Sequence, residues 1–402
     1  MSTSKIKWCL NTNTNAPQIS NEWGVFPRIL KKLLVEGFFL GASKVIRVDS
    51  KYIYFEKTFN ISQYQLIEIK SESGLLNGEH RVVEITSDFF TIPLVDNATS
   101  FSNENFEFSF KGLGWEIVHE SLNSIVFKPN GDQGPNHCLH VNNNAPYPDY
   151  PSTKYKFVSF ALSENSKEGT PLGLTAPTYW NSTASTLTGT DFSPASNFAL
   201  YSLDTYLTSS SSLSAYTSST TNGSSWFFTG NSDYFYFFYS THASYTYSSV
   251  IASGNYTSFL EGYEYNSFLI PSNLKKKDTE ITVVPTYINT AVTTSGSCST
   301  VSGYLDTTHD TMSLASLNGI TRSGYDDILN PAGPCFFFDV FLKDPKQTLL
   351  GSLPSFYWLA QNRPFTRGGI FKRGSELFMA RELYIDRSNL GQVVVKIGEL
   401  NE

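Results

Sequence analysis

The sequence predicts a mainly β protein, built from β-sandwich and β-barrel modules with one N-terminal amphipathic helix, so that its α+β character is minor. Short runs of alternating apolar and polar residues recur along the 402-residue chain and end at Gly, Asn or Ser, which is typical of strands. Aromatic residues make up 15%, with 31 Phe and 23 Tyr, and charged residues only 16%. Aromatic side chains favour strands and supply a core, so we expect a folded, β-rich chain.

One helix is expected near the start, over residues 25–36. Pro27 is compatible with a first helical turn, and Gly37 predicts the end of the helix. A lone helix in a β-rich chain is expected to cover the core of a sheet. The apolar positions recur every three or four residues, and basic residues occupy the other face: Phe26, Ile29, Leu30, Leu33 and Leu34 against Arg28, Lys31 and Lys32.

The sequence predicts a first domain over residues 1–96, consisting of this helix and a small β-barrel module. Its strands alternate apolar and polar residues and are separated by turn residues such as Gly74 and the pair Asn77-Gly78. The expected strands cover residues 44–49, 52–55, 65–70, 80–86 and 89–94.

A larger β-sandwich-like domain is expected over residues 97–402, after a polar linker at 97–100. Two aromatic runs, 225–229 and 234–239, flank Gly230-Asn231 and predict a hairpin of buried, central strands in the largest sheet. The turn-rich stretch 295–330 predicts an insertion that faces a partner. Other expected strands cover 107–110, 115–119, 124–127, 138–141, 265–270, 281–287, 336–342, 356–359, 376–385 and 392–397.

Charge and segment composition exclude several function classes. The net charge is −7, whereas a general nucleic-acid binder needs a basic face, so no nucleic-acid partner is expected. No run approaches 18 apolar residues, which predicts no membrane span, and the first residues lack the apolar core of a secretory signal. The four scattered cysteines, Cys9, Cys138, Cys298 and Cys335, predict free buried thiols.

The sequence predicts no catalytic residues, no cofactor and no metal site, so the chain is expected not to be an enzyme. His137, Cys138 and His140 form the most metal-like cluster. In a strand, however, His137 and Cys138 point to opposite faces, so at most two ligands converge. The pattern favours a strand with one buried thiol and two partly exposed imidazoles. No GxSxG, P-loop or GxGxxG motif is present.

Two groups of residues are candidates for an interface or for recognition. Tyrosines among Ser and Asn form either a platform that stacks on sugars or packing between identical subunits, and the second is favoured. A basic group around Gly368-Gly369 is expected to form intersubunit salt bridges. The candidates are Tyr245, Tyr247, Tyr256, Tyr263 and Tyr265 in the first group, and Arg367, Lys372 and Arg373 in the second.

Two motif stretches carry a family resemblance. Residues 64–92 contain "LNG", a strand with two valines and "FFTI". Residues 114–128 contain "GW" and "NSIVFK", and the strand "CLHVN" follows at residues 138–142. This order resembles a group of largely uncharacterised tailed-bacteriophage virion structural, tail-associated proteins with a small β-barrel module. Asn142 to Asn144 replace a common acidic run, and Ser355 stands where a glycine is usual.

The resemblance implies a virion structural protein that is made and assembled in the host cytoplasm. It would be a tail, tail sheath, neck or collar subunit that packs with copies of itself in a symmetric ring, beside other tail or neck proteins, through β-edge and aromatic interfaces. Three alternatives stay open. They are a receptor-binding or adhesion protein for host attachment, which contacts a surface glycan or outer-membrane protein; a capsid decoration protein; and a tail-associated glycan hydrolase.

Overall fold

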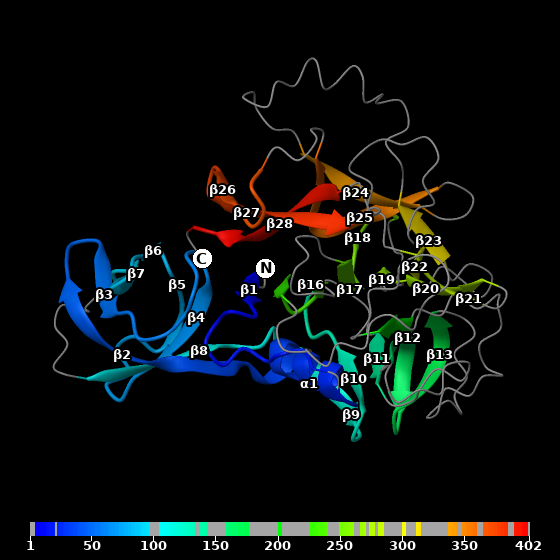
Figure 1. The fold of residues 1–402 in the computed structure, drawn as a ribbon, viewed down its shortest axis with the longest axis horizontal. Coiled ribbons are helices and arrows are strands. Elements are labelled where there is room, and N and C mark those ends of the chain that lie inside the picture. The colour runs from blue at the N-terminus through cyan, green and yellow to red at the C-terminus, as the bar shows by residue number, and fades with distance from the viewer. Residues whose placement is uncertain are drawn as a thin grey trace, which may run out of the picture.

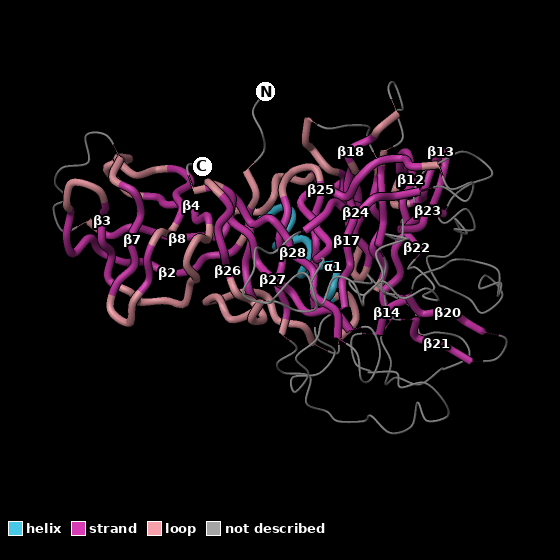
Figure 2. The backbone as a smooth tube through the Cα atoms, turned by 90° about the horizontal axis from the view of Figure 1, so that it is seen from above, coloured by secondary structure: helices cyan, strands magenta, loops and turns pink. Residues whose placement is uncertain are grey.

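A computed structural model describes residues 5–20, 22–95, 104–132, 137–143, 157–176, 200–202, 225–239, 249–260, 266–270, 273–277, 280–284, 300–302, 311–314, 337–343, 348–359, 365–384 and 390–400. The fold is mainly β, as expected. Among the described residues, four antiparallel sheets are accompanied by one short helical segment at residues 25–36 (Figures 1 and 2). The predicted linker at 97–100 and most of the predicted insertion at 295–330 lie outside the described residues.

A seven-stranded sheet forms the small β-barrel module. Its order is β5-β4-β8-β2-β3-β7-β6, and the outermost strands β5 and β6 are separated in the chain by only Val82 and Val83, so the sheet curls until its ends meet. Rings of Phe55, Phe90 and Phe108 pack against one another inside it. The strands are β2 (Phe38–Val48), β3 (Tyr52–Glu56), β4 (Leu66–Lys70), β5 (Gly78–Arg81), β6 (Glu84–Ile85), β7 (Phe89–Pro93) and β8 (Asn105–Phe110).

The predicted boundary at residue 96 does not match the sheets. Strand β8 lies beyond that boundary, yet it pairs with β2 and β4 in the barrel. Its alternating aromatics explain this, because Phe106 and Phe108 enter the barrel core while Phe110 enters the core of the larger unit. Conversely, β1 (Lys7–Leu10) pairs with a strand of the large sheet. The barrel therefore extends past residue 96, and the first strand of residues 1–96 belongs to the large sheet.

The largest sheet has 13 strands in the order β1-β15-β16-β17-β19-β22-β23-β24-β25-β28-β27-β26, with β18 paired to β25. Each residue of β15 and β16 is buried, as the aromatic runs predict, but β15 lies second in the order rather than at the centre. The strands are β15 (Trp226–Gly230), β16 (Tyr234–Tyr239), β17 (Ser249–Asn255), β18 (Thr257–Ser258), β19 (Ser267–Ile270), β22 (Thr300–Ser302), β23 (Thr311–Leu314), β24 (Phe337–Lys343), β25 (Leu349–Leu359), β26 (Ile370–Arg373), β27 (Glu376–Tyr384) and β28 (Leu390–Glu399).

A six-stranded sheet covers one side of these strands. It has the order β13-β12-β11-β10-β9, with β14 paired to β12, and a separate pair joins β20 to β21. Strands that are consecutive in the sequence pair with each other, so most of this sheet is a meander. Its strands are β9 (Glu116–Glu120), β10 (Ser124–Lys128), β11 (Cys138–Asn142), β12 (Phe157–Lys167), β13 (Thr170–Ala176) and β14 (Leu200–Ser202), and the pair is β20 (Asn273–Lys277) with β21 (Glu280–Val284).

Two apolar cores lie on opposite faces of β15 and β16. One face carries Phe235 and Phe237 and packs against the six-stranded sheet. The other carries Tyr236 and Phe238 and packs against β24, β25, β27 and β28, which form the upper layer in Figure 1. The phenol of Tyr236 donates a hydrogen bond across this second core to the carbonyl of Pro354, at 2.8 Å. This layered packing agrees with the expected sandwich-like architecture.

The predicted helix is present as α1 (Val25–Lys31), which continues as a π-helical turn, η1 (Lys32–Glu36). It covers a core, as expected, and its Phe26 ring contacts Phe160 of β12 and Phe237 of β16, at centroid distances of 5.8 and 5.3 Å. The helix therefore wedges between two sheets. Gly37 ends it with a φ of 75°, a conformation that glycine adopts without strain.

Strand β1 joins the barrel to the large sheet. Lys7 pairs with Glu79 of β5 at 2.6 Å and donates to the carbonyl of Gly112 at 3.0 Å. On the same junction, the guanidinium of Arg81 is buried against Gly398 of β28, where an added Cβ would lie 2.6 Å from Nη1. The barrel is thus attached to the large sheet by buried polar contacts as well as by apolar ones.

Candidate functional site

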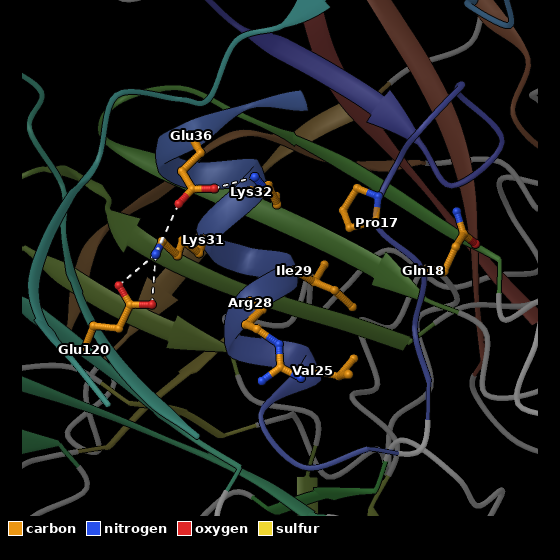
Figure 3. A pocket seen from close by; sticks show the side chains of 9 residues that line it. All are labelled: Pro17, Gln18, Val25, Arg28, Ile29, Lys31, Lys32, Glu36 and Glu120. Atoms are coloured by element: carbon orange, nitrogen blue, oxygen red, sulfur yellow. Dashed lines mark hydrogen bonds and ion pairs between the residues drawn. The ribbon is translucent and has the colours of Figure 1, made fainter. Parts of the chain in front are cut away.

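A shallow pocket lies beside helix α1, between the helix and the segment that contains Pro17 (Figure 3). Its volume is about 290 Å³. Apolar parts of Pro17, Val25 and Ile29 line it, and charged residues of the helix and of β9 lie at its rim. The helical period places Val25 and Ile29 one turn apart on the same face, which explains the apolar strip.

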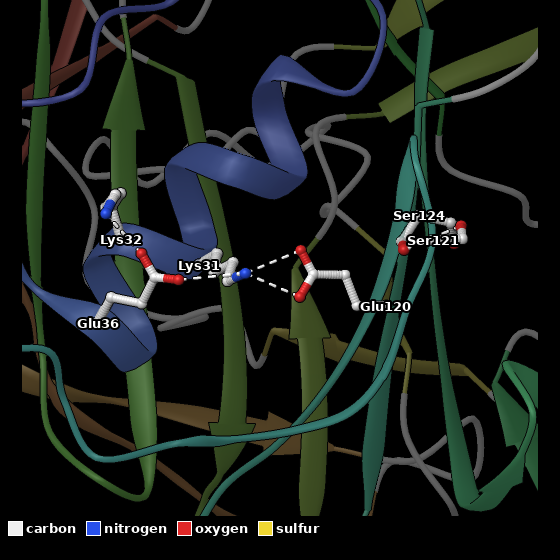
Figure 4. Close-up of polar contacts among 6 residues, drawn as sticks. All are labelled: Lys31, Lys32, Glu36, Glu120, Ser121 and Ser124. Atoms are coloured by element: carbon white, nitrogen blue, oxygen red, sulfur yellow. Dashed lines mark hydrogen bonds and ion pairs between the residues drawn. The ribbon is translucent and has the colours of Figure 1, made fainter.

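An ion network closes one side of this pocket (Figure 4). The Nζ of Lys31 donates to both carboxylate oxygens of Glu120, each at 2.8 Å, and lies 3.1 Å from Glu36. Glu36 also pairs with Lys32, four residues earlier, at 2.5 Å. These bonds raise the pKa of Lys31, through Glu120 first and Glu36 second, and the hydrogen bond from Lys32 lowers the pKa of Glu36.

The network acts as a clamp between the end of the helix and strand β9. Its carboxylates already accept hydrogen bonds from lysines, so their charge is balanced within the chain. The sequence indicates the Lys32–Glu36 pair by its spacing of four residues. Glu120 lies on β9, 89 residues after Lys31 in the chain, and no local sequence signal predicts their contact.

Of the five tyrosines in the predicted platform, Tyr256 lies within the described residues, and it is not at the surface. Tyr256 is only 1% exposed and belongs to the core between β16 and β25, so the expectation that it forms a recognition surface is wrong. Tyr256 lies between β17 and β18 in the chain, and its backbone carbonyl accepts a hydrogen bond from the side chain of Asn266. Tyr245, Tyr247, Tyr263 and Tyr265 lie outside the described residues.

The predicted basic group gathers at one hairpin. Lys372 and Arg373 are exposed on β26, and Arg367 is half-buried in the turn before it. Lys372 also has a contact within the chain, because its Nζ lies 5.0 Å from the centroid of the Tyr64 ring in the barrel. This cation–π contact joins β26 to the barrel and leaves Arg373 exposed on the other face.

Two outer strands carry opposite charges. Strand β26 ends the 13-stranded sheet and displays Lys372 and Arg373, while β9 ends the six-stranded sheet and displays the exposed Glu116, since the charge of Glu120 is already balanced by Lys31. Among the described residues, each of these strands pairs with one neighbour, so one backbone edge of each has no strand partner. Open edges of this kind are templates for pairing with another strand.

His137, just before β11, and His140, within it, are both buried, so the expectation of partly exposed imidazoles is wrong. His140 bonds the hydroxyl of Ser163 through Nε2 at 2.7 Å. Burial lowers the pKa of both His137 and His140 to about 4. Cys138 is a free, buried thiol, as is Cys9. Among the described residues, no three His, Cys, Asp or Glu side chains gather as metal ligands.

Arg381 of β27 is a buried cation that the sequence does not indicate. It is 7% exposed, and its guanidinium carbon lies 4.8 Å from the centroid of Phe227 and 5.8 Å from that of Phe238. Among the described residues, its Nε is fully buried and has no hydrogen-bond partner. Burial lowers its pKa to about 9; Arg367 adds to this shift and Glu382 opposes it.

The energetic balance at Arg381 is unfavourable. Burying a charge without a partner costs several kcal/mol. Each cation–π contact returns about 0.5–2 kcal/mol, so Phe227 and Phe238 offset only part of this cost. Arg381 remains charged at neutral pH, because its pKa stays above 7.

No family model matches this chain, and no curated protein sequence matches it. Within the described residues, none of the helical segments has the length and apolar character needed to cross a membrane.

Proposed function

We propose that this chain is a structural subunit of a tailed-bacteriophage virion, in a tail, sheath, neck or collar ring. One observation carries the assembly part of this proposal, namely the two outer strands β9 and β26 with opposite charge. Because these strands differ, contact between β26 of one copy and β9 of the next is heterologous. Such contacts generate a closed ring when the rotation between copies closes.

The bacteriophage part of the proposal is supported by the two motif stretches. The "GW" stretch forms the hairpin of β9 and β10, and Trp115 is buried with its indole Nε1 donating to the carbonyl of Asn231 at 3.0 Å. Ser355, where the resembling proteins usually have glycine, has a φ of 57°, a conformation that glycine adopts without strain. The motif residues thus have structural roles that fit the pattern.

The assembly is tested with purified recombinant chain by light scattering after size-exclusion chromatography. We expect the unmodified chain to form one uniform species of several copies. The double substitution K372E and R373E should produce monomers, because it places acidic residues against Glu116. Adding E116K to this variant should restore assembly. Lys44 and Lys51 are exposed barrel lysines, so K44E with K51E is the matched control and should leave the mass unchanged.

The place in a particle is tested by quantitative mass spectrometry of purified virions from the source. A reproducible copy number of about six, twelve or a larger multiple, relative to the major capsid protein, is expected for a symmetric ring. Absence of the chain from the particle would refute the virion proposal. A monomeric recombinant chain whose mass does not respond to charge reversal would refute the pairing of β9 with β26.

A further inference from the structure

The space beside Arg381 is shaped by a glycine turn. Gly368 lies opposite Arg381 across the hairpin, because its N–H donates to the carbonyl of Ala380 at 2.9 Å. Of the described residues, a Cβ placed on Gly368 would meet only Arg381, with Nη1 at 3.9 Å. A larger side chain at residue 368 would occupy this side of the guanidinium, so the glycine leaves it open.

The surroundings of Arg381 favour an anion. The rings of Phe227 and Phe238 lie against the guanidinium, and the charge of Arg367 adds to the positive potential there. The opposite charge of Glu382 belongs to the next residue of the strand, whose side chain points to the other face. A planar guanidinium held in this way presents a fork of donors that matches carboxylate and phosphate oxygens.

We propose that Arg381, with Arg367 beside it, forms a site that binds an oxyanion, either a carboxylate or a phosphate group, on the side left open by Gly368. The anion supplies the charge partner that the described residues do not. The inference is independent of the ring assembly proposed above. Two sources fit this chemistry, a free anion and an acidic side chain of a second copy.

Isothermal titration of the full chain with inorganic phosphate, and separately with acetate, tests the site. We expect saturable binding of one phosphate per chain, at constant ionic strength. The R381M variant keeps an apolar stem beside the two rings and loses the charge, and its phosphate affinity should fall by about tenfold or more. Arg47 also stacks on an aromatic ring, that of Tyr54, but is exposed, so R47Q is the matched control and should bind phosphate normally.

Thermal unfolding separates a binding role from a structural one. Without phosphate, R381M should unfold at a higher temperature than the unmodified chain, since it replaces a buried charge that has no ion-pair partner among the described residues with an apolar group. Phosphate should raise the unfolding temperature of the unmodified chain and have no effect on R381M. The R367Q variant leaves the buried stack intact and should weaken phosphate binding without loss of folding.

The molar mass of the protein in solution distinguishes the two sources of the anion. If a second copy supplies a carboxylate, phosphate should lower the molar mass of the self-associated chain, and R381M should have a lower molar mass than the unmodified chain at the same concentration. If the anion is free, mass should not respond to phosphate or to R381M. The site is refuted if R381M changes neither the binding of phosphate, nor the binding of acetate, nor self-association. It is also refuted if R381M unfolds at a lower temperature than the unmodified chain and phosphate raises the unfolding temperature of both proteins equally.

Discussion

The indole Nε1 of Trp8 donates a hydrogen bond to the backbone carbonyl of Tyr64, at 3.0 Å. Trp8 lies on β1 at the end of the large sheet, and Tyr64 lies in the barrel with a φ of 67°. The same carbonyl accepts a second hydrogen bond from Nη1 of Arg81 at 2.8 Å. One peptide group therefore links the barrel and the large sheet, and Lys372 lies over the ring of the same residue.

We predict that W8F destabilises this junction. Phenylalanine keeps most of the ring and removes the donor, so the expected loss in unfolding free energy is about 1–3 kcal/mol. Urea denaturation followed by circular dichroism measures it. The comparison is R47Q, which removes a stacked but exposed barrel arginine and should cost less than 1 kcal/mol, or roughly the value of an exposed cation–π contact. Equal losses in both variants would contradict the special role of the Tyr64 carbonyl.

Ser355 combines a backbone strain with a useful hydrogen bond. Its φ is 57°, and Tyr234 donates through its phenol to Oγ of Ser355 at 2.7 Å. S355G relieves the strain and loses the bond, so its stability should remain within about 1 kcal/mol of the unmodified chain. S355A keeps the strain and loses the bond, and should be the less stable variant. Thermal unfolding of both proteins measures this order, and the reverse order would contradict it.

The buried histidines make stability depend on pH. His137 and His140 have a folded pKa of about 4, against about 6.5 when unfolded. Above pH 6.5 both are neutral in either state, so this stability is fully present. As the pH falls from 6.5 to 4, the unfolded chain binds protons and the folded chain does not, so stability falls by about 1.4 kcal/mol per pH unit for each histidine. Below pH 4 they add no further loss.

Urea denaturation at a series of pH values measures this slope. The double variant H137Q and H140Q should lose stability at pH 8, because Ser163 loses its imidazole partner, but its decline between pH 6.5 and 4 should be shallower. A slope unchanged by the double substitution would show that other groups cause the acid destabilisation.

The clamp around Lys31 should contribute little to stability. Lys31 is 23% exposed and Glu120 is 41% exposed, so water screens the pair, and exposed ion pairs contribute about 0.2–1 kcal/mol. K31M should cost about this amount at low salt, and the difference from the unmodified chain should shrink in 1 M salt. K70M provides a control, because Lys70 is 65% exposed and lies 3.8 Å from its partner Glu68. A loss that persists in high salt would indicate that Lys31 acts through its packed stem.

Local pattern predicted much of this fold. The helix, the barrel strands and the aromatic hairpin follow from periodicity and turn residues, because these signals act over a few neighbouring positions. The domain boundary did not follow, since β1 and β8 pair with strands far away in sequence. Tyr256 shows the same limit for a candidate site: polar neighbours in sequence suggested a surface position, yet the residue is buried.

The mainly β class, the amphipathic helix and the apolar residues that form the cores follow from the pattern of the sequence. The contact of Arg381 with Phe227 and Phe238, the pairing of Glu120 with Lys31 and the outer positions of β9 and β26 depend on the tertiary structure. The alternation of apolar and polar residues along a strand predicts which of its faces is buried, but not which other strand packs against that face. Contacts between strands distant in the chain depend on how the layers close, and that closure places the charges on which both proposals rest.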